Sequence, residues 1–196
     1  MEKELSEKIV KELLEKKGKA RGDLLLAHLR YIQRIYGDKG KSAVENKLNE
    51  IGVDLKKLEI NTFTWYPVGY EPLIILAAKE TFKWDDEEVF KMGKNIIKLS
   101  LIIKLMLPLF VSIDKVFEKS PKFWKNNYDF GEVEPVGREG GTYILRIKDY
   151  DIHPISCIYN AGHIIGLAEM AGRKGMTIEE KVCTHRGGGY HEYHIK

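Results

Sequence analysis

The sequence predicts an α+β fold in which N-terminal helices pack with a small antiparallel sheet. Apolar residues recur at helical spacing up to about residue 127, and the pattern changes abruptly at Tyr128. Residues 128–196 then follow the order strand, strand, helix, strand, strand. A chain of 196 residues is long enough for one substantial core, so we expect a single ligand-binding domain over residues 1–196.

The composition narrows the possible functions. The chain is 43% hydrophobic and 31% charged, which is typical of a globular protein, and its many Lys, Glu and Ile residues favour a thermophilic source. The net charge of +3 comes from 32 basic and 29 acidic residues that are interleaved along the chain. No face is therefore expected to track a phosphate backbone, and we expect no nucleic-acid partner.

The N-terminal segment, residues 1–20, is expected to form a helix because Leu5, Ile9 and Leu13 are spaced at helical intervals among Glu and Lys. It has no apolar signal core, so a cytoplasmic location is expected. The longest uninterrupted apolar run, residues 105–111, contains Pro108 and is far shorter than the roughly 20 residues of a membrane span. We therefore expect no such span.

Further helices are expected before the sheet. Gly18 and Gly22 end the first helix, and Asp23 is expected to cap a second helix that runs to about Tyr36. A third helix is expected over residues 42–51 and a short strand over residues 60–65. The spacing then predicts helices over 72–82, 85–108 and 113–124, with the acidic run at 85–88 suited to a helix N-terminus.

The C-terminal third is expected to contain two hairpins joined by a helix. Strands are predicted over residues 130–136 and 142–147, with glycines between them that favour a turn. Pro154 suits the first turn of a helix that ends near Gly172. A second hairpin is predicted from strands over 177–185 and 190–196, joined through the glycine run at 187–189.

Two cysteines and one histidine lie where this topology could bring them together. If the last hairpin pairs symmetrically about Gly187, Cys183 lies opposite His191, and Cys157 lies in the first turn of the preceding helix. Thiolates with imidazole suit zinc, which needs a fourth ligand. Alternatively, both thiols pack as small hydrophobes, or a Cys–His pair acts in catalysis, although no accompanying oxyanion site is identifiable.

A family resemblance rests on these same residues. The segments 157–162, 166–169 and 179–183, together with Gly189 and His191, resemble the C-terminal signature of the vinyl-4-reductase domain family. The resemblance implies an α+β ligand-binding fold that is usually dimeric, and hence a homodimer here. That fold is related to haem-nitric-oxide sensor domains and to subunits of the TRAPP transport complex.

The resemblance also implies a structural zinc ion. In the aromatic-sensing members of the family, similarly spaced cysteines bind zinc together with a carboxylate from an upstream strand. Cys157 and Cys183 match those cysteines, His191 stands in place of a third cysteine, and Glu134 falls where the carboxylate is expected. Other candidates for the fourth ligand are Glu132, His153 and His185.

Two features of the family's sensors are missing. The polar contacts that the phenol sensors make have no match here, which disfavours phenol as the ligand. The tyrosine, serine and arginine motif that holds haem propionates in the related sensors is also absent. We therefore expect His28 to be a core or surface residue rather than an axial haem ligand.

A hydrophobic small molecule is the expected ligand, bound among the helices rather than at the metal. Apolar side chains at helical spacing could line such a pocket, although the same pattern also builds an ordinary core. The candidate pocket residues are Trp65, Tyr70, Phe90, Ile97, Leu101, Leu105, Phe110 and Trp124.

The expected function is therefore a small-molecule-binding or sensing domain with a structural zinc site. An alternative is an enzyme or accessory subunit that acts on a tetrapyrrole, which rests on the family name alone because no nicotinamide or flavin fingerprint is present. A third possibility, an assembly component, predicts a constitutive dimer with an apolar interface. No catalytic set can be assigned.

Overall fold

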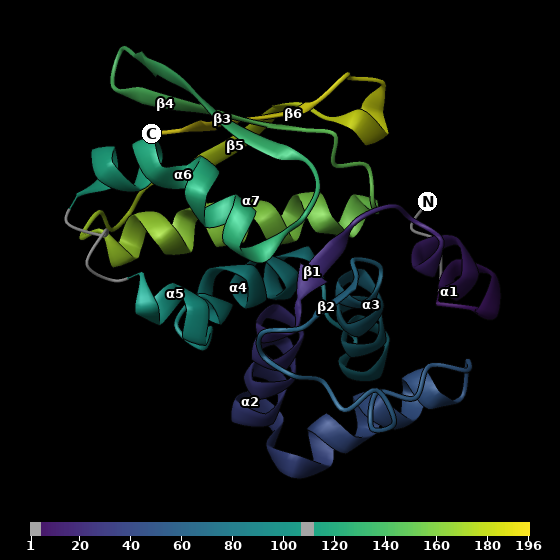
Figure 1. Ribbon diagram of the computed structural model, residues 1–196. Coiled ribbons are helices and arrows are strands. Elements are labelled where there is room, and N and C mark those ends of the chain that lie inside the picture. Colours follow the sequence, from purple (N-terminus) through teal and green to yellow (C-terminus); the bar gives the residue numbers. More distant parts are fainter. Residues whose placement is uncertain (1–4, 107–111) are drawn as a thin grey trace.

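The computed structural model describes residues 5–106 and 112–196 and has the predicted α+β architecture (Figure 1). A four-stranded antiparallel sheet forms one outer layer, helices α6 (Ile113–Asn127) and α7 (Pro154–Met170) lie against it, and the remaining helices lie beyond α7. Within the described ranges, no helix is long and apolar enough to cross a membrane.

The two predicted hairpins form this sheet. Strand β3 (Glu132–Glu139) pairs with β4 (Thr142–Lys148), and β5 (Ile178–Val182) pairs with β6 (His191–Ile195). The strand order is β3-β4-β6-β5, so the strand nearest the C-terminus occupies an inner position. The second hairpin has a longer connection than predicted, because Cys183 already leaves the ladder and starts the short 3-10 turn η2 (Thr184–Arg186).

Helix α7 packs closely on α4 (Asp86–Ile96) through glycines. A Cβ atom at Gly93 would lie 2.1 Å from the carbonyl oxygen of Tyr159, and one at Gly162 would lie 2.1 Å from that of Phe90. Gly166 meets the backbone of Lys94 in the same way, at 2.3 Å. The two helices therefore touch backbone to backbone, and only glycine fits at these positions.

Helix α2 (Gly22–Asn49) replaces the two separate helices that the sequence predicts. Gly37, with φ of 69°, kinks it where the sequence predicts a break. Asp23 does not cap α2. Its buried carboxylate instead accepts hydrogen bonds from the backbone N–H groups of Leu101 (3.0 Å) and Ile102 (3.1 Å) and from the Ser100 hydroxyl.

This contact explains why the long helix predicted over residues 85–108 is interrupted. Helix α4 begins at the expected acidic cap, Asp85, but it ends at Ile96. Ser100 adopts an extended conformation and caps α5 (Leu101–Leu105), accepting the N–H of Ile103 at 3.0 Å. Asp23 and Ser100 together satisfy the first N–H groups of a new helix, so the chain changes direction there.

The remaining elements complete the helical part. Helices α1 (Glu7–Leu14) and α3 (Tyr70–Phe82) lie close to their predicted positions. The strand predicted over residues 60–65 is instead β2 (Trp65–Pro67), and it pairs with β1 (Lys19–Arg21), which the sequence did not indicate.

Candidate functional site

Four side chains that could hold a metal ion converge between α7 and the second hairpin. They are Cys157 on α7, Glu180 on β5, Cys183 directly after β5, and His191 at the start of β6. One potential ligand atom from each lies within 4.8 Å of those of the others. The structure therefore brings together all three residues of the predicted cysteine and histidine set.

The distances inside this cluster suit a shared ion. The Sγ atoms of Cys157 and Cys183 are 3.6 Å apart, and Cys157 Sγ is 3.7 Å from His191 Nδ1. Two thiolates on one tetrahedral zinc ion are expected about 3.8 Å apart, given Zn–S bonds of about 2.3 Å. Glu180 Oε1 lies 2.9 Å from His191 Nδ1, so a carboxylate oxygen is close enough to serve as a fourth ligand.

The cluster is largely buried and brings together three groups that can become anionic. Cys183 and His191 are 4% and 1% exposed. Burial raises the pKa of the Cys157 thiol, and the neighbouring Glu180 and Cys183 raise it further. Burial also acts to raise the pKa of Glu180, but the hydrogen bond and charge of His191 outweigh it and lower that pKa. A cation among these groups would relieve both the burial cost and the mutual repulsion.

His191 is oriented by contacts on its outer side. Its Nε2 lies 2.8 Å from the carbonyl oxygen of Tyr150 and 2.9 Å from Thr184 Oγ1. Because a carbonyl oxygen can only accept, we assign a proton to Nε2. Nδ1 faces the cluster, where it donates to Glu180 Oε1 at 2.9 Å, and a bound metal ion would take the place of the Nδ1 proton. Metal-binding histidines commonly have such a carbonyl partner behind the ring.

The carboxylate in the cluster is Glu180 and not the expected Glu134. Glu134 lies on β3, where its Oε2 is 2.9 Å from Lys148 Nζ. Glu180 and Cys183 are three residues apart and would point to opposite faces of a regular strand. A register shift between Glu180 and Val182 changes this, and both side chains reach the same point.

The other candidates for the fourth ligand have different partners. Glu132 lies 3.8 Å from Lys148, and His153 caps α7 by accepting the N–H of Ile155 at 3.2 Å. His185 Nδ1 lies 3.2 Å from Asp151 Oδ1. His153 and His185 line a surface cleft of about 520 Å³ between α1 and the start of α7, outside the four-residue cluster.

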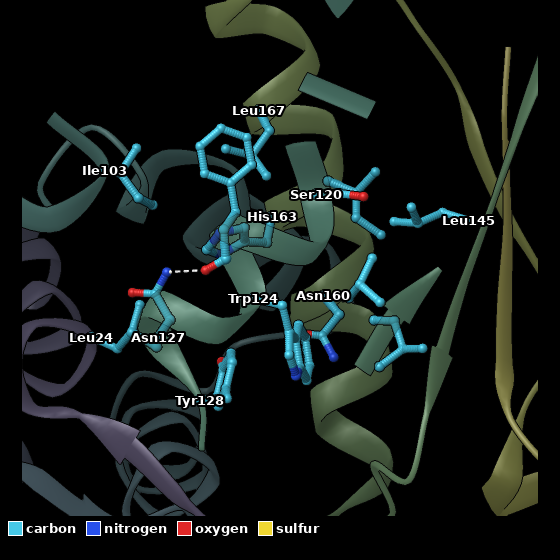
Figure 2. Close-up of a pocket in the computed structure, with 14 residues that line it drawn as sticks. Leu24, Ile103, Ser120, Trp124, Asn127, Tyr128, Leu145, Asn160, His163 and Leu167 are labelled. Carbon is cyan, nitrogen blue, oxygen red and sulfur yellow. Dashed lines mark hydrogen bonds between the residues drawn. The ribbon is translucent and has the colours of Figure 1, made fainter. Parts of the chain in front are cut away.

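A separate cavity of about 70 Å³ lies between α6, α7 and the sheet (Figure 2). Aromatic and aliphatic side chains form most of its wall, and a few neutral polar groups interrupt it. The lining residues are Leu24, Ile103, Ser120, Phe123, Trp124, Asn127, Tyr128, Val133, Leu145, Ile147, Asn160, His163, Ile164 and Leu167.

The polar groups of the cavity are uncharged. Burial, together with His28, lowers the pKa of His163 to about 4, so its imidazole is neutral at physiological pH. Asn127 donates its Nδ2 to the carbonyl oxygen of Phe123 at 2.8 Å, which Figure 2 marks with a dashed line. None of the described residues that line the cavity is Lys, Arg, Asp or Glu.

The cavity differs from the predicted pocket. Of the predicted residues, only Trp124 is among the described residues that line it. Ile97 is buried core, and Leu101 and Leu105 on α5 are 40% and 67% exposed. Trp65 lies under the Arg21 guanidinium, and Tyr70 and Phe90 are partly buried against the core. Phe110 lies outside the described residues.

A group of buried polar side chains lies behind the cavity. Tyr128 lines the cavity with its side chain and donates its hydroxyl to Glu71 Oε1 at 3.3 Å. Glu71 is 2% exposed, and burial raises its pKa to about 8 against the opposing effect of that hydrogen bond. His28 is a core residue that donates Nδ1–H to the Leu24 carbonyl at 2.6 Å and stacks on Tyr159, with 5.0 Å between ring centroids.

Comparison with known proteins shows the fold but no family. No protein family model matches the chain, and no curated protein matches it. Several solved structures are similar, each covering 90% of this chain. An H-NOX protein from S. oneidensis in its Fe(II)NO ligation state has a TM-score of 0.71 at 13% identity and is covered over 98% of its length.

Two further similar structures belong to the same group. A mutant of T. Tengcongensis H-NOX has a TM-score of 0.63 at 14% identity, with 96% of that chain covered. An oxygen-binding H-NOX domain related to soluble guanylate cyclases has a TM-score of 0.62 at 13% identity, with 94% covered. At these identities the likeness shows a shared α+β fold.

Proposed function

We propose that this protein is a small-molecule-binding, sensor-type domain whose C-terminal hairpin is fastened to helix α7 by a structural zinc ion. The observation that carries the proposal is the convergence of Cys157, Glu180, Cys183 and His191. Residues far apart in the chain reach one buried point there with four donor atoms of the kinds that zinc accepts. The vinyl-4-reductase family resemblance, which rests on the same segment, supports this assignment.

The donor set favours zinc over other metals. Two thiolates and one imidazole are soft or borderline ligands, whereas calcium and magnesium need oxygen ligands. Four protein ligands complete a tetrahedral zinc site and leave no open position for substrate, as in structural rather than catalytic centres. The burial of Cys183 and His191 agrees with a structural role.

Metal analysis of the purified protein tests this part of the proposal. We expect about one equivalent of zinc per chain, lost in Cys183→Ala. The matched control is Asn95→Ala, which alters a partly buried side chain on α4 that bonds to the Lys91 carbonyl and is not part of the cluster, and it should keep its zinc. A folded wild-type protein without any bound metal would refute the zinc assignment.

The cavity is the proposed ligand site. Small-molecule sites are commonly apolar hollows with a few polar groups, and this cavity combines aromatic walls with Asn160 and His163. Its volume of about 70 Å³ corresponds to roughly five water molecules. The ligand is therefore a small neutral molecule, or a larger one that displaces the cavity wall when it enters.

Haem does not fit this cavity, although one of the similar structures was solved to probe haem distortion. A haem group requires far more than 70 Å³, a histidine at the iron and cations near its propionates. Among the described lining residues, His163 is the only one with an imidazole, and neither Lys nor Arg occurs. We expect titration with haem to give no saturable, stoichiometric Soret shift, and a one-to-one complex would overturn this conclusion.

A second candidate function is an enzyme or accessory subunit acting on a tetrapyrrole, which the haem-related neighbours favour over other cofactor chemistry. The small cavity argues against it for the same reason. The decisive measurement is reductant consumption with a vinyl-bearing porphyrin, for which we expect no turnover above the uncatalysed rate. The homodimer suggested by the family resemblance is tested separately, by light scattering at micromolar concentration.

A further inference from the structure

The metal cluster and the cavity are both in contact with one residue, Tyr150. This residue is 2% exposed and lies in the connection between β4 and α7. Its carbonyl oxygen accepts from His191 Nε2 at 2.8 Å, and its ring packs edge-on against the His191 ring, with 6.2 Å between centroids. Tyr150 therefore fixes the position of one of the proposed metal ligands.

The same side chain supports the cavity wall. The Tyr150 ring packs edge-on against Trp124, with 5.2 Å between centroids, and against Tyr128, with 5.9 Å. Trp124 and Tyr128 both line the cavity, so the Tyr150 ring supports two side chains of its wall.

Helix α7 provides a second connection. It carries Cys157 in its first turns, and it carries Asn160 and His163 within the next two turns. Cys157 and these two cavity residues therefore belong to one continuous helix, which Gly162 and Gly166 hold in backbone contact with α4. A change in the position of Cys157 is expected to displace the cavity wall.

We propose that metal binding at the Cys157–Glu180–Cys183–His191 cluster sets the shape of the cavity through Tyr150, so that metal occupancy and the cavity are energetically linked. The inference rests on the proposed function, because it requires that the cluster take up a metal ion. Linkage between two sites is reciprocal, so a change in the cavity wall at Asn160 must in turn change the metal affinity.

The first test uses Trp124 as a reporter of the cavity. Replacing Trp65 and Trp84 by Phe leaves Trp124 as the single tryptophan. Zinc alone is titrated into the chelated protein, and the Trp124 emission maximum is expected to shift until about one equivalent is bound. In the control variant Trp65 and Trp124 are replaced by Phe, which leaves Trp84 as the single tryptophan. Trp84 packs near Tyr31 and Tyr36, away from the cluster, and its emission maximum should not change when zinc is added.

The second test measures zinc affinity on the folded, metal-loaded protein by competition with a chromophoric chelator. Asn160→Ala removes a cavity-lining side chain about one turn from Cys157 on α7 and is expected to weaken zinc binding about fivefold or more, as in measured couplings between sites. The matched control Asn95→Ala removes an asparagine that bonds within α4, to the Lys91 carbonyl, and should keep the wild-type affinity.

The outcomes separate the two proposals. A wild-type protein that takes up no metal refutes the zinc site and with it this linkage. Stoichiometric zinc binding with wild-type affinity in Asn160→Ala overturns the linkage alone, as does an unchanged Trp124 emission in a protein that stays folded without metal. If chelation unfolds the protein, as circular dichroism would show, the affinity comparison decides.

Discussion

Glu180 illustrates how one irregular backbone position determines the composition of a site. Without the register shift between Glu180 and Val182, the carboxylate would point away from Cys183, and the cluster would have three potential ligands instead of four. Sequence reasoning identified Cys157, Cys183 and His191 from hairpin symmetry and family resemblance. It missed Glu180 because alternation along a strand says nothing about where a bulge occurs.

The contribution of Glu180 can be compared with that of Glu134, the carboxylate that the sequence suggested. Glu180→Gln removes an anionic ligand atom, and we expect zinc affinity to fall by a factor of about 10 to 100. Glu134→Gln alters a half-exposed partner of Lys148 and should leave the affinity unchanged. Chelator competition measures both affinities. If Glu134→Gln weakened zinc binding and Glu180→Gln did not, Glu134 would be the fourth ligand.

Glu71 predicts a distinctive dependence of stability on pH. Burial raises its pKa to about 8 against the opposing effect of the Tyr128 hydrogen bond, so the folded state binds its proton more tightly than the unfolded chain does. The free energy of unfolding should therefore decrease as pH rises from about 4.5 and level off above about 8.

Glu71→Gln removes this titration while keeping an oxygen for the Tyr128 hydroxyl. At pH 9 we expect the variant to be more stable than the wild type by at least about 1 kcal/mol, because each pKa unit corresponds to about 1.4 kcal/mol. Urea denaturation at about pH 6 and about pH 9 measures the difference. A stability gap between variant and wild type that is equal at both pH values would show that Glu71 is not protonated in the folded protein.

At the scale of elements, the contact between α4 and α7 depends on three glycines. Gly162→Ala would place a methyl group 2.1 Å from the Phe90 carbonyl oxygen, which belongs to rigid backbone. We expect a loss of about 2 kcal/mol or more, since overpacking outweighs the better helix propensity of alanine. Gly189→Ala, where a Cβ meets nothing within 4 Å, is the matched control and should change stability little.

Elements were predictable from the sequence where local signals agreed with tertiary contacts. The hairpins and α7 were anticipated because turn glycines, Pro154 and apolar spacing all pointed the same way. The interruption between α4 and α5 was not. It depends on the Asp23 carboxylate, which is distant in sequence and caps α5 at the Leu101 and Ile102 N–H groups. No local pattern reveals such a contact.

At the scale of the whole molecule, the metal is expected to act as a cross-link between the sheet and the helical layer. Zinc present at about a thousand times its dissociation constant adds roughly 4 kcal/mol to stability. For a chain of this size, that corresponds to a decrease in melting temperature of roughly 10 °C on chelation. Cys183→Ala should melt like the chelated wild type and show no further decrease with chelator, as calorimetry would test.

The architecture was more predictable than the cavity. Composition and periodicity suffice for an α+β fold, because they report which faces are apolar. They do not distinguish a packed core from a hollow one, which depends on how side chains from α2, α5, α6, α7 and the sheet meet. His163 was missed because its neighbours on α7 are apolar, and a single polar residue in such a helix gives no sign of lining a cavity.

The inner position of β6 has a consequence for biosynthesis. Strand β6 pairs with β4 on one side and with β5 on the other, and its residues come last among the strands of the sheet. A nascent chain therefore exposes the edge of β4 and two free thiols until β6 has been made. During that interval the helical layer can already form, but Cys157 and Cys183 stay open to oxidation and mispairing. The proposed zinc ion could protect these thiols only after β6 has been made, because His191 on β6 belongs to the same cluster.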